Sequence, residues 1–264
     1  MRRRAFLGTV GSATSVAAPA LAQGRVEWRM VTAWPKDMPG FGTGAERFAR
    51  RVGEMSGGRL VIRIHPAGDL VPALQGFDAV ANGTAEMSHG AAYHHIEKSK
   101  AFGFFAGVPF GLTAEEHVAW LRLGGGQRLW DELAEPFGVK PILCGVAGAR
   151  TAVWFQKEIR SPEELSGLRI RTSGYGAEVF ERLGAKTARL SAGEIASAFQ
   201  AKAIDAADGF GPAADLSLDL PKSARFYYWP GVHEPISAVE LLVDRKSTRL
   251  NSSHVSESRM PSSA

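Results

Sequence analysis

The sequence has only one cysteine, Cys144, among 264 residues, so no internal disulfide can form. Cys144 follows the apolar residues Ile142 and Leu143, which favours a buried structural thiol over the nucleophile of a thiol hydrolase. A GxSxG elbow and a glycine-rich phosphate loop are also lacking. The chain therefore carries no motif of a serine hydrolase or of a nucleotide-binding enzyme.

The sequence also lacks a large charge imbalance once its two ends are set aside. The formal net charge is +4, but Arg2, Arg3 and Arg4 contribute +3, and residues 246–264 contribute +2. Residues 23–245 therefore carry a net charge of −1. Because this balance gives no attraction for polyanions, nucleic acid and membrane surfaces are not expected partners.

Residues 1–22 predict an export signal that is not part of the fold. Three arginines precede a weakly apolar run over 5–19, which is too short to span a bilayer. Residues 20–22, ALA, form a small-x-small cleavage site, and residues 3–7, RRAFL, resemble the twin-arginine export pattern. We expect the mature chain to lie outside the cytoplasm, in a bacterial periplasm.

Residues 246–264 predict a disordered, non-native tail. They hold seven serines and no sustained apolar period, and the string resembles the chance translation of a sequencing adapter. Residues 237–245, SAVELLVDR, predict a strand that should lead into more of the domain. We therefore expect a truncated reading frame, with an uncovered strand edge at 239–243 that lowers stability.

Strand and helix patterns alternate between these two ends, which predicts an α/β fold with parallel strands. Helical spacing of apolar residues predicts helices that end near Gly57 and Gly83, and a helix over 121–133 that is interrupted at 124–126. Alternating or short apolar runs predict strands at 26–34, 60–64, 87–93, 141–145, 152–156, 168–171, 187–190 and 204–210.

These units fall into two groups, which predicts two lobes at residues 23–135 and 136–245. About 220 residues can bury a substantial core as one large or two small domains. Ligands favour the cleft between two such lobes, and the lobes can close around a ligand by a hinge motion. The expected fold is therefore a two-lobe binding protein with its ligand cleft between the lobes.

The stretch Gly167–Ala185, GLRIRTSGYGAEVFERLGA, is the most informative part of the chain. Alternation over 168–171 predicts a short strand, glycines break it, and an amphipathic helix follows. Arg171 is thereby placed at the carboxyl end of a strand, where α/β sheets collect their ligands. A guanidinium there offers a fixed fork of donors for a carboxylate, although spacing alone favours a solvated surface arginine.

Five motifs along the chain are informative when they are taken together and in order. They are AWPK (33–36), AGDLVPALQGFDAV (67–80), GLRIR (167–171), FERLGA (180–185) and AIDAAD (203–208). This set resembles the substrate-receptor (DctP-type) subunits of tripartite ATP-independent periplasmic (TRAP) transporters, in particular the branch that binds keto acids and hydroxy acids such as pyruvate or lactate. The resemblance covers about residues 26–245.

The resemblance implies a set of ligand and cation contacts. It implies that Arg171 pairs with the carboxylate of the ligand and that Tyr93 is an aromatic wall near it. In this branch a cation bridges ligand and protein. The corresponding cation ligands here are the Asp208 carboxylate, the Gly209 backbone carbonyl and the Glu234 carboxylate, and hard oxygens of this kind suit Na⁺ or Ca²⁺.

The chain departs from that branch at three of these positions. Arg150 stands where the branch commonly has a glutamine, Asp208 replaces a longer glutamate, and Gly209 replaces a bulky aromatic residue. Arg150 and Arg171 together predict a clamp for one carboxylate or a dicarboxylate. Arg150 could instead do the electrostatic work of the bridging cation, so metal-free and metal-bridged forms both stay open. Trp154 and Phe210 are candidates for the cleft wall, with core packing as the alternative.

His89, His94 and His95 raise the alternative of a zinc site. Adjacent side chains diverge on a strand, so stacking or surface roles are favoured. The sequence thus predicts a non-catalytic solute receptor that delivers a small organic acid to TRAP membrane subunits, with a homodimer as a further option. An exported enzyme and a receptor of an ATP-driven importer are the alternatives.

Overall fold

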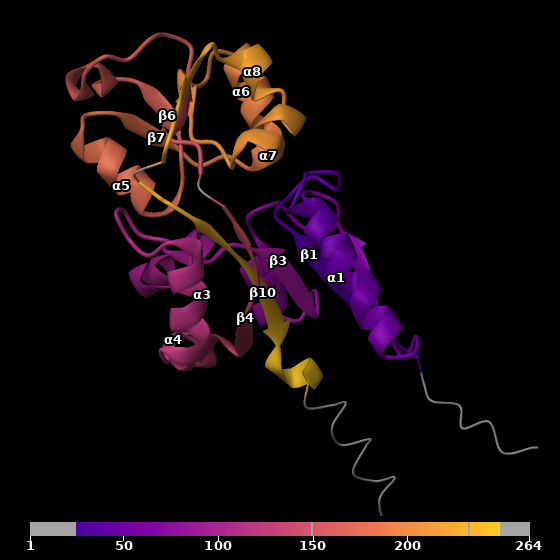
Figure 1. The fold of residues 1–264 in the computed structure, drawn as a ribbon. Helices are drawn as coiled ribbons and strands as arrows, with labels where there is room; N and C mark the ends of the chain where they lie inside the picture. Colours follow the sequence, from indigo (N-terminus) through magenta and orange to yellow (C-terminus); the bar gives the residue numbers. More distant parts are fainter. Residues whose placement is uncertain (1–24, 149, 232, 249–264) are drawn as a thin grey trace, which may run out of the picture.

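Two five-stranded sheets, each with helices packed against it, form two lobes that lie one above the other (Figure 1). This computed structural model describes residues 25–148, 150–231 and 233–248. The predicted export signal, residues 1–22, and most of the predicted tail, residues 249–264, lie outside the described residues. Within the described ranges, no helix combines the length and the apolar character that a membrane crossing requires.

The first lobe is built on a sheet with strand order β2-β1-β3-β10-β4. The first three strands are parallel, and β10 runs antiparallel to both of its neighbours. The strands are β1 (Val26–Thr32), β2 (Leu60–His65), β3 (Met87–Gly90), β4 (Val139–Ala147) and β10 (Ser237–Asp244). The helices are α1 (Gly42–Met55), α2 (Gly76–Ala81), η1 (Ala92–His95), η2 (Lys100–Phe105), α3 (Ala114–Leu123), α4 (Gly126–Ala134) and η3 (Glu135–Phe137).

The second lobe is built on a smaller sheet with strand order β7-β6-β8-β5-β9. Its parallel centre is β7-β6-β8, and β5 pairs antiparallel with both β8 and β9. The strands are β5 (Val153–Phe155), β6 (Arg169–Arg171), β7 (Lys186–Ala188), β8 (Ala206–Ala207) and β9 (Phe226–Tyr228). The helices are η4 (Pro162–Leu165), α5 (Gly174–Arg182), η5 (Ala192–Glu194), α6 (Ile195–Gln200), α7 (Pro212–Ser217) and α8 (Leu220–Ser223).

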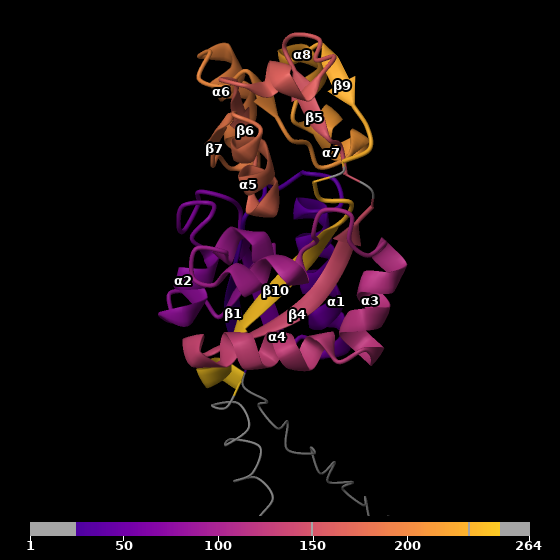
Figure 2. The same ribbon diagram turned by 90° about the vertical axis from the view of Figure 1, so that its left-hand side faces the viewer.

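The predicted boundary between the lobes, at residues 135/136, is wrong. Strands β4 and β10 belong to the first sheet and run side by side toward the second lobe (Figure 2). The chain therefore enters the second lobe after β4 and returns before β10. A boundary drawn along the sequence misses this, because the pairing of β10 with β3 and β4 is non-local.

The same pairing overturns the expectation of an exposed edge at 239–243. Strand β10 lies between β3 and β4, and all eight of its residues are buried. Other expectations are confirmed. The predicted break at 124–126 separates α3 from α4, where Gly125 adopts a left-handed backbone with φ 83°. Residues 237–244 form the expected strand.

Contacts between side chains of the two lobes hold them together. Phe210 of the second lobe packs edge-on against Trp34 and Phe41 of the first, with ring centroids 6.0 and 5.7 Å apart. At another edge, the Arg189 guanidinium pairs with Glu97 at 2.6 Å and donates a hydrogen bond to the His94 carbonyl. The structure therefore shows the lobes in contact around the predicted cleft.

Candidate functional site

Arg171 is the last residue of β6 and points into the junction of the two lobes. Arg169 and Arg171 lie on the same face of β6, but Arg169 is its first residue and its side chain is 43 % exposed, whereas Arg171, at the carboxyl end between β7 and β8, is only 2 % exposed. Its Nε donates to the Leu190 carbonyl at 2.9 Å, and its Nη1 pairs with Asp208. Among the described residues, Nη2 has no hydrogen-bond partner. The guanidinium is therefore anchored on one side and keeps donors for an anion.

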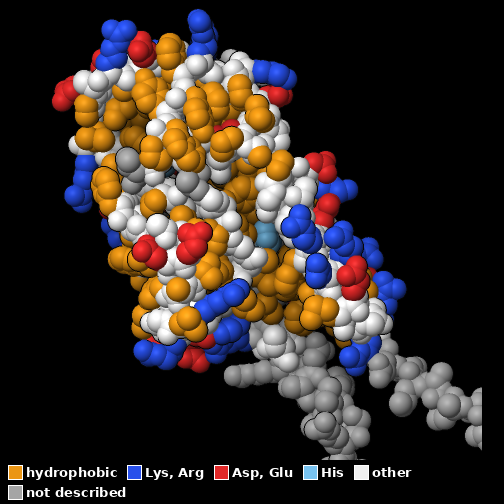
Figure 3. Space-filling model, in the orientation of Figure 1, with side chains coloured by type: hydrophobic (Ala, Val, Ile, Leu, Met, Phe, Trp, Pro, Cys, Tyr) orange, Lys and Arg blue, Asp and Glu red, His pale blue; other side chains and the backbone are white. Residues whose placement is uncertain are grey.

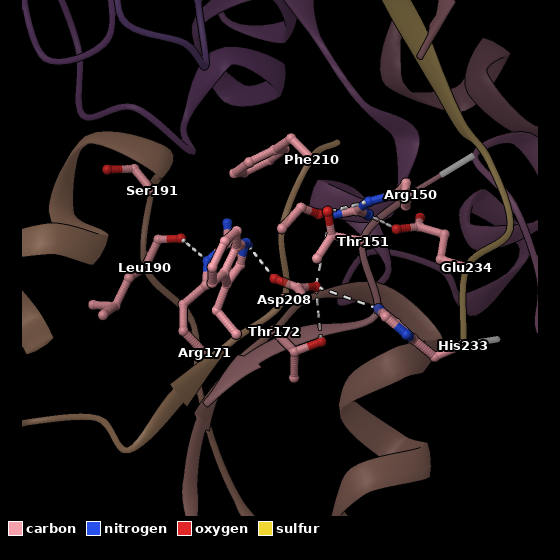
Figure 4. A network of polar contacts seen from close by, with 12 residues as sticks. Arg150, Thr151, Arg171, Thr172, Leu190, Ser191, Asp208, Phe210, His233 and Glu234 are labelled. Atoms are coloured by element: carbon pink, nitrogen blue, oxygen red, sulfur yellow. Dashed lines mark hydrogen bonds and ion pairs between the residues drawn. The ribbon is translucent and has the colours of Figure 1, made fainter. Parts of the chain in front are cut away.

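Asp208 follows β8 and accepts from the groups around it (Figure 4). Its second oxygen receives a hydrogen bond from Thr172 Oγ1 at 3.1 Å and lies 3.7 Å from Nε2 of His233. Full burial raises the pKa of this carboxyl, but the charges of Arg171 and Arg150 and the contact with His233 outweigh that effect. The pKa of Asp208 is consequently far below its usual value, and the group stays ionised.

Arg150 is 1 % exposed and is surrounded by protein oxygens. Its Nε and Nη2 donate to the Gly209 carbonyl at 3.1 and 2.8 Å, and its Nη1 forms an ion pair with Glu234. Nη2 also lies 3.6 Å from an oxygen of Asp208. Arg150 and Glu234 lie on the two segments that connect the lobes, and these segments are joined by the Gly231 N–H, which donates to the Arg150 carbonyl at 2.9 Å.

Two aromatic side chains cover the guanidinium pair. The Phe210 ring centroid lies 5.1 Å from Cζ of Arg171 and 5.4 Å from Cζ of Arg150. The Tyr93 ring, from η1 of the first lobe, lies 5.7 Å from Cζ of Arg150. The buried Tyr93 hydroxyl has no hydrogen-bond partner within the described part of the chain. Rings from both lobes thus enclose the two cations, as cation–π packing favours.

Trp154 contacts Asp215 next to the site rather than the two arginines. Its Nε1 donates to the buried Asp215 at 2.9 Å, and Asp215 also accepts from Thr151 Oγ1 at 2.6 Å and from the Phe210 N–H at 2.7 Å. A side chain at Gly209 would collide with this carboxylate, since a Cβ would lie 2.3 Å from its Oδ2. This explains why glycine stands at 209: the space of a larger residue is filled by Asp215.

Sequence reasoning missed Asp215 and His233. Asp215 lies in the first turn of α7, and only the fold brings it within hydrogen-bond distance of Trp154 on β5. His233 contacts Asp208 from the connecting segment, five residues after β9 ends. Neither residue belongs to a recognisable motif. The only signal was its proximity in sequence to a predicted site residue, Phe210 or Glu234.

The oxygens predicted as cation ligands do not fit a metal ion here. The Asp208 carboxylate, the Gly209 carbonyl and the Glu234 carboxylate converge, but they converge on the guanidinium of Arg150 (Figure 4). A bound Ca²⁺ requires six to eight oxygens at about 2.3–2.6 Å. Over residues 25–248, with the two single-residue gaps, no group of three or more acidic, histidine or cysteine side chains is arranged to hold a metal ion.

The three clustered histidines do not form a zinc site. His95 Nε2 contacts the Glu240 carboxylate at 2.8 Å, while His89 Nδ1 accepts from Trp34 Nε1 at 3.2 Å. Burial lowers the pKa of His89 to about 4, and burial together with neighbouring cations lowers the pKa of His94 well below its usual value. His94 and His95 lie against the rings of Trp34, Tyr93 and Phe77 in tilted or edge-on contacts, so they pack among aromatic side chains of the first lobe.

A groove of about 560 Å³ lies beside the site, next to α1 (Figure 3). Phe41, His89, Cys144 and Phe210 are part of its wall, and Arg47 is on its rim. Burial raises the pKa of Cys144 to about 11, in line with an inert structural thiol. Neither Arg150 nor Arg171 lines this groove, so the guanidinium pair is enclosed by Phe210 rather than open to it.

Two α/β lobes with buried arginines at their junction define a solute-binding protein. The sequence matches the DctP family, bacterial extracellular solute-binding proteins of family 7, over residues 30–247. The chain belongs to this family, and its predicted resemblance and fold class are confirmed. It is 42 % identical, over 255 residues, to the monocarboxylate 2-oxoacid-binding periplasmic protein of Nostoc sp. strain PCC 7120. The match covers 92 % of this chain and 70 % of the Nostoc protein.

Solved TRAP transporter solute-binding proteins have the same fold. One from Bordetella bronchiseptica, with calcium and picolinate, is 35 % identical with a TM-score of 0.84, over 90 % of this chain and 68 % of that one. One from Pseudoalteromonas atlantica, with sodium and pyruvate, is 36 % identical with a TM-score of 0.82, over 86 % and 68 %. One from Colwellia psychrerythraea, with calcium and pyruvate, is 36 % identical with a TM-score of 0.81, over 86 % and 69 %.

Proposed function

We propose that this protein is the extracytoplasmic receptor of a TRAP transporter and captures a small 2-oxo monocarboxylate such as pyruvate. The observation that carries the proposal is Arg171: a buried guanidinium, anchored by Leu190 and Asp208, with one terminal nitrogen left for an anion. The Nostoc relative, named for 2-oxoacid binding, supports the same ligand class.

The enclosure of the site favours a short acid. Phe210 covers both guanidinium groups and Tyr93, from the opposite lobe, covers that of Arg150, so a ligand carboxylate would be held away from water. Charge-assisted hydrogen bonds are stronger in such surroundings than at an exposed surface. The unpartnered Tyr93 hydroxyl is a suitable donor to the 2-oxo group of the ligand. A dicarboxylate is the second candidate ligand, because Arg150 and Arg171 lie side by side under Phe210 and each could pair with one carboxylate.

The proposed role is binding and delivery, without catalysis. Lobe closure would enclose the acid, and lobe opening at the membrane would release it to the TRAP membrane subunits. We place the receptor in the periplasm on the strength of the export pattern in residues 1–22, and we include a homodimer because the Bordetella relative is described as a dimer.

Isothermal titration calorimetry of the purified chain with pyruvate, longer 2-oxo acids, lactate and succinate tests this proposal. We expect saturable binding of a short 2-oxo acid at one site, with the acid recovered unchanged. Arg169→Gln is the matched control, because Arg169 lies on the same strand but is 43 % exposed and pairs with Asp205 outside the site. Turnover of the acid, or binding that Arg171→Lys leaves unchanged, would refute the proposal.

A further inference from the structure

The guanidinium of Arg150 lies where three oxygen groups converge. The Gly209 carbonyl, the Glu234 carboxylate and one oxygen of Asp208 all face it, and the side chain is 1 % exposed. These are the oxygen types that would otherwise bind Na⁺ or Ca²⁺. We propose that Arg150 is the resident cation of this site, so that the receptor binds its acid without the sodium or calcium found with ligand in its relatives. This inference rests on the proposed function.

The hydrogen bonds of Arg150 support that role. A guanidinium has five N–H donors in a fixed plane. Two of them point at the Gly209 carbonyl, and Nη1 forms an ion pair with Glu234. The oxygens are therefore already satisfied by a group that cannot lose its charge at physiological pH. The donors that remain, one on each terminal nitrogen, are available to an oxygen of the acid.

The charges of the site lead to the same conclusion. Arg150 and Arg171 carry two positive charges, and Asp208 and Glu234 carry two negative charges, so the four groups are balanced before the acid binds. A metal ion would have to approach these carboxylates next to a guanidinium that is only 1 % exposed. Like charges in a buried site repel strongly, because little solvent screens them. The carboxylate of the acid, by contrast, can accept charge-assisted hydrogen bonds from the guanidinium donors that the described residues do not use.

Replacement of Arg150 by glutamine should make binding of the acid depend on a metal cation. Arg150→Gln removes one charge and leaves the Gly209 carbonyl and the Glu234 carboxylate without their partner, while the amide adds one more oxygen. The variant therefore presents an oxygen-lined space with a net negative charge, which favours a cation. We expect the wild-type protein to be independent of cations and the variant to require one.

The test measures pyruvate affinity in potassium buffer with EDTA, and again with added CaCl₂ or NaCl. For the wild type we expect less than about a twofold change in Kd, and for Arg150→Gln a gain of about tenfold or more on cation addition. Terbium luminescence of the acid-free proteins gives a second readout, with binding expected for the variant alone. Arg160→Gln, an exposed arginine paired with Glu158 in the same lobe, makes the same charge change and should behave as wild type.

The measurements on the wild-type protein test the inference even if Arg150→Gln does not fold. Loss of pyruvate binding in EDTA that calcium or sodium restores, or stoichiometric terbium binding by the wild type, overturns the inference and leaves the receptor function standing. No binding of any short 2-oxo acid, with or without cation, overturns the proposed function and this inference with it. Equal affinity in all buffers, together with no terbium binding, supports it.

Discussion

Removal of the Arg171 charge should abolish high-affinity binding of the acid. The guanidinium is buried, and Asp208, its partner, is fully buried as well. Truncating one partner of a buried, hydrogen-bonded charge pair costs on the order of 2–5 kcal/mol of binding. Because about 1.4 kcal/mol corresponds to a tenfold change in Kd, we expect Arg171→Met to bind pyruvate roughly 30- to several thousand-fold more weakly.

The single variant has a stability cost that must be separated from its loss of binding. Without Arg171, the buried Asp208 keeps Thr172, His233 and the more distant Arg150 as partners. A buried charge left without its main partner costs about 3–5 kcal/mol of unfolding free energy. The double variant Arg171→Met/Asp208→Asn removes both charges, so it should recover much of the lost stability while binding stays weak.

Calorimetry and urea unfolding of the wild type, both variants and Arg169→Gln measure the two effects independently. Arg169 is a fitting control because it is an arginine at the other end of β6, where it is partly exposed and pairs with Asp205 at 2.7 Å, outside the site. Wild-type affinity in the double variant would contradict the reasoning, because an anion would then be held without this guanidinium. Weak binding in the Arg169→Gln control would point to a general effect on the strand.

Three further perturbations test other parts of the structure. Burial lowers the pKa of folded His89 to about 4, so this residue should contribute a fall of about 2 kcal/mol in the unfolding free energy between pH 7.5 and pH 5, as the unfolded imidazole takes up protons. Buried His94 adds to the same slope, so His89→Gln, which can still accept from Trp34, should reduce the slope by the share of His89, and an unchanged slope in urea titrations would contradict this. Arg189→Ala removes a half-exposed contact between the lobes and should weaken pyruvate binding about two- to fivefold, mainly through faster dissociation in stopped-flow traces; an unchanged rate would count against it. Gly209→Ala should cost about 1–3 kcal/mol of unfolding free energy, because its Cβ meets Asp215, and a wild-type urea midpoint would refute that packing.

The sequence allowed the position of Arg171 to be predicted, because that position depends on local pattern. Alternation over 168–171 followed by glycines is enough to place the residue at the end of a strand and before a helix, and β6 and α5 have that arrangement. The family motifs then selected Asp208, Gly209 and Glu234, which the structure brings together around Arg150. Their roles toward a ligand stay predictions.

Non-local pairing was beyond the reach of the sequence. The period-two pattern in 237–245 predicts a strand, but it does not say that β10 inserts between β3 and β4. The predicted lobe boundary and the predicted exposed strand edge were both wrong because of this insertion of β10. Asp215 was missed for a related one: its three hydrogen bonds come from Thr151, Trp154 and Phe210, which only the folded chain brings within reach.

The placement of β10 has a consequence for how the polypeptide folds during synthesis. Strand β10, residues 237–244, lies between β3 and β4 in the first sheet, but it is synthesised only after the whole second lobe. The second lobe can assemble as a continuous insert, whereas the first must hold β3 and β4 apart until their common neighbour emerges. Distant pairings of this sort slow folding, because a long loop has to close first. A nascent chain that stops short of Ser237 would therefore offer two unsatisfied strands to chaperones.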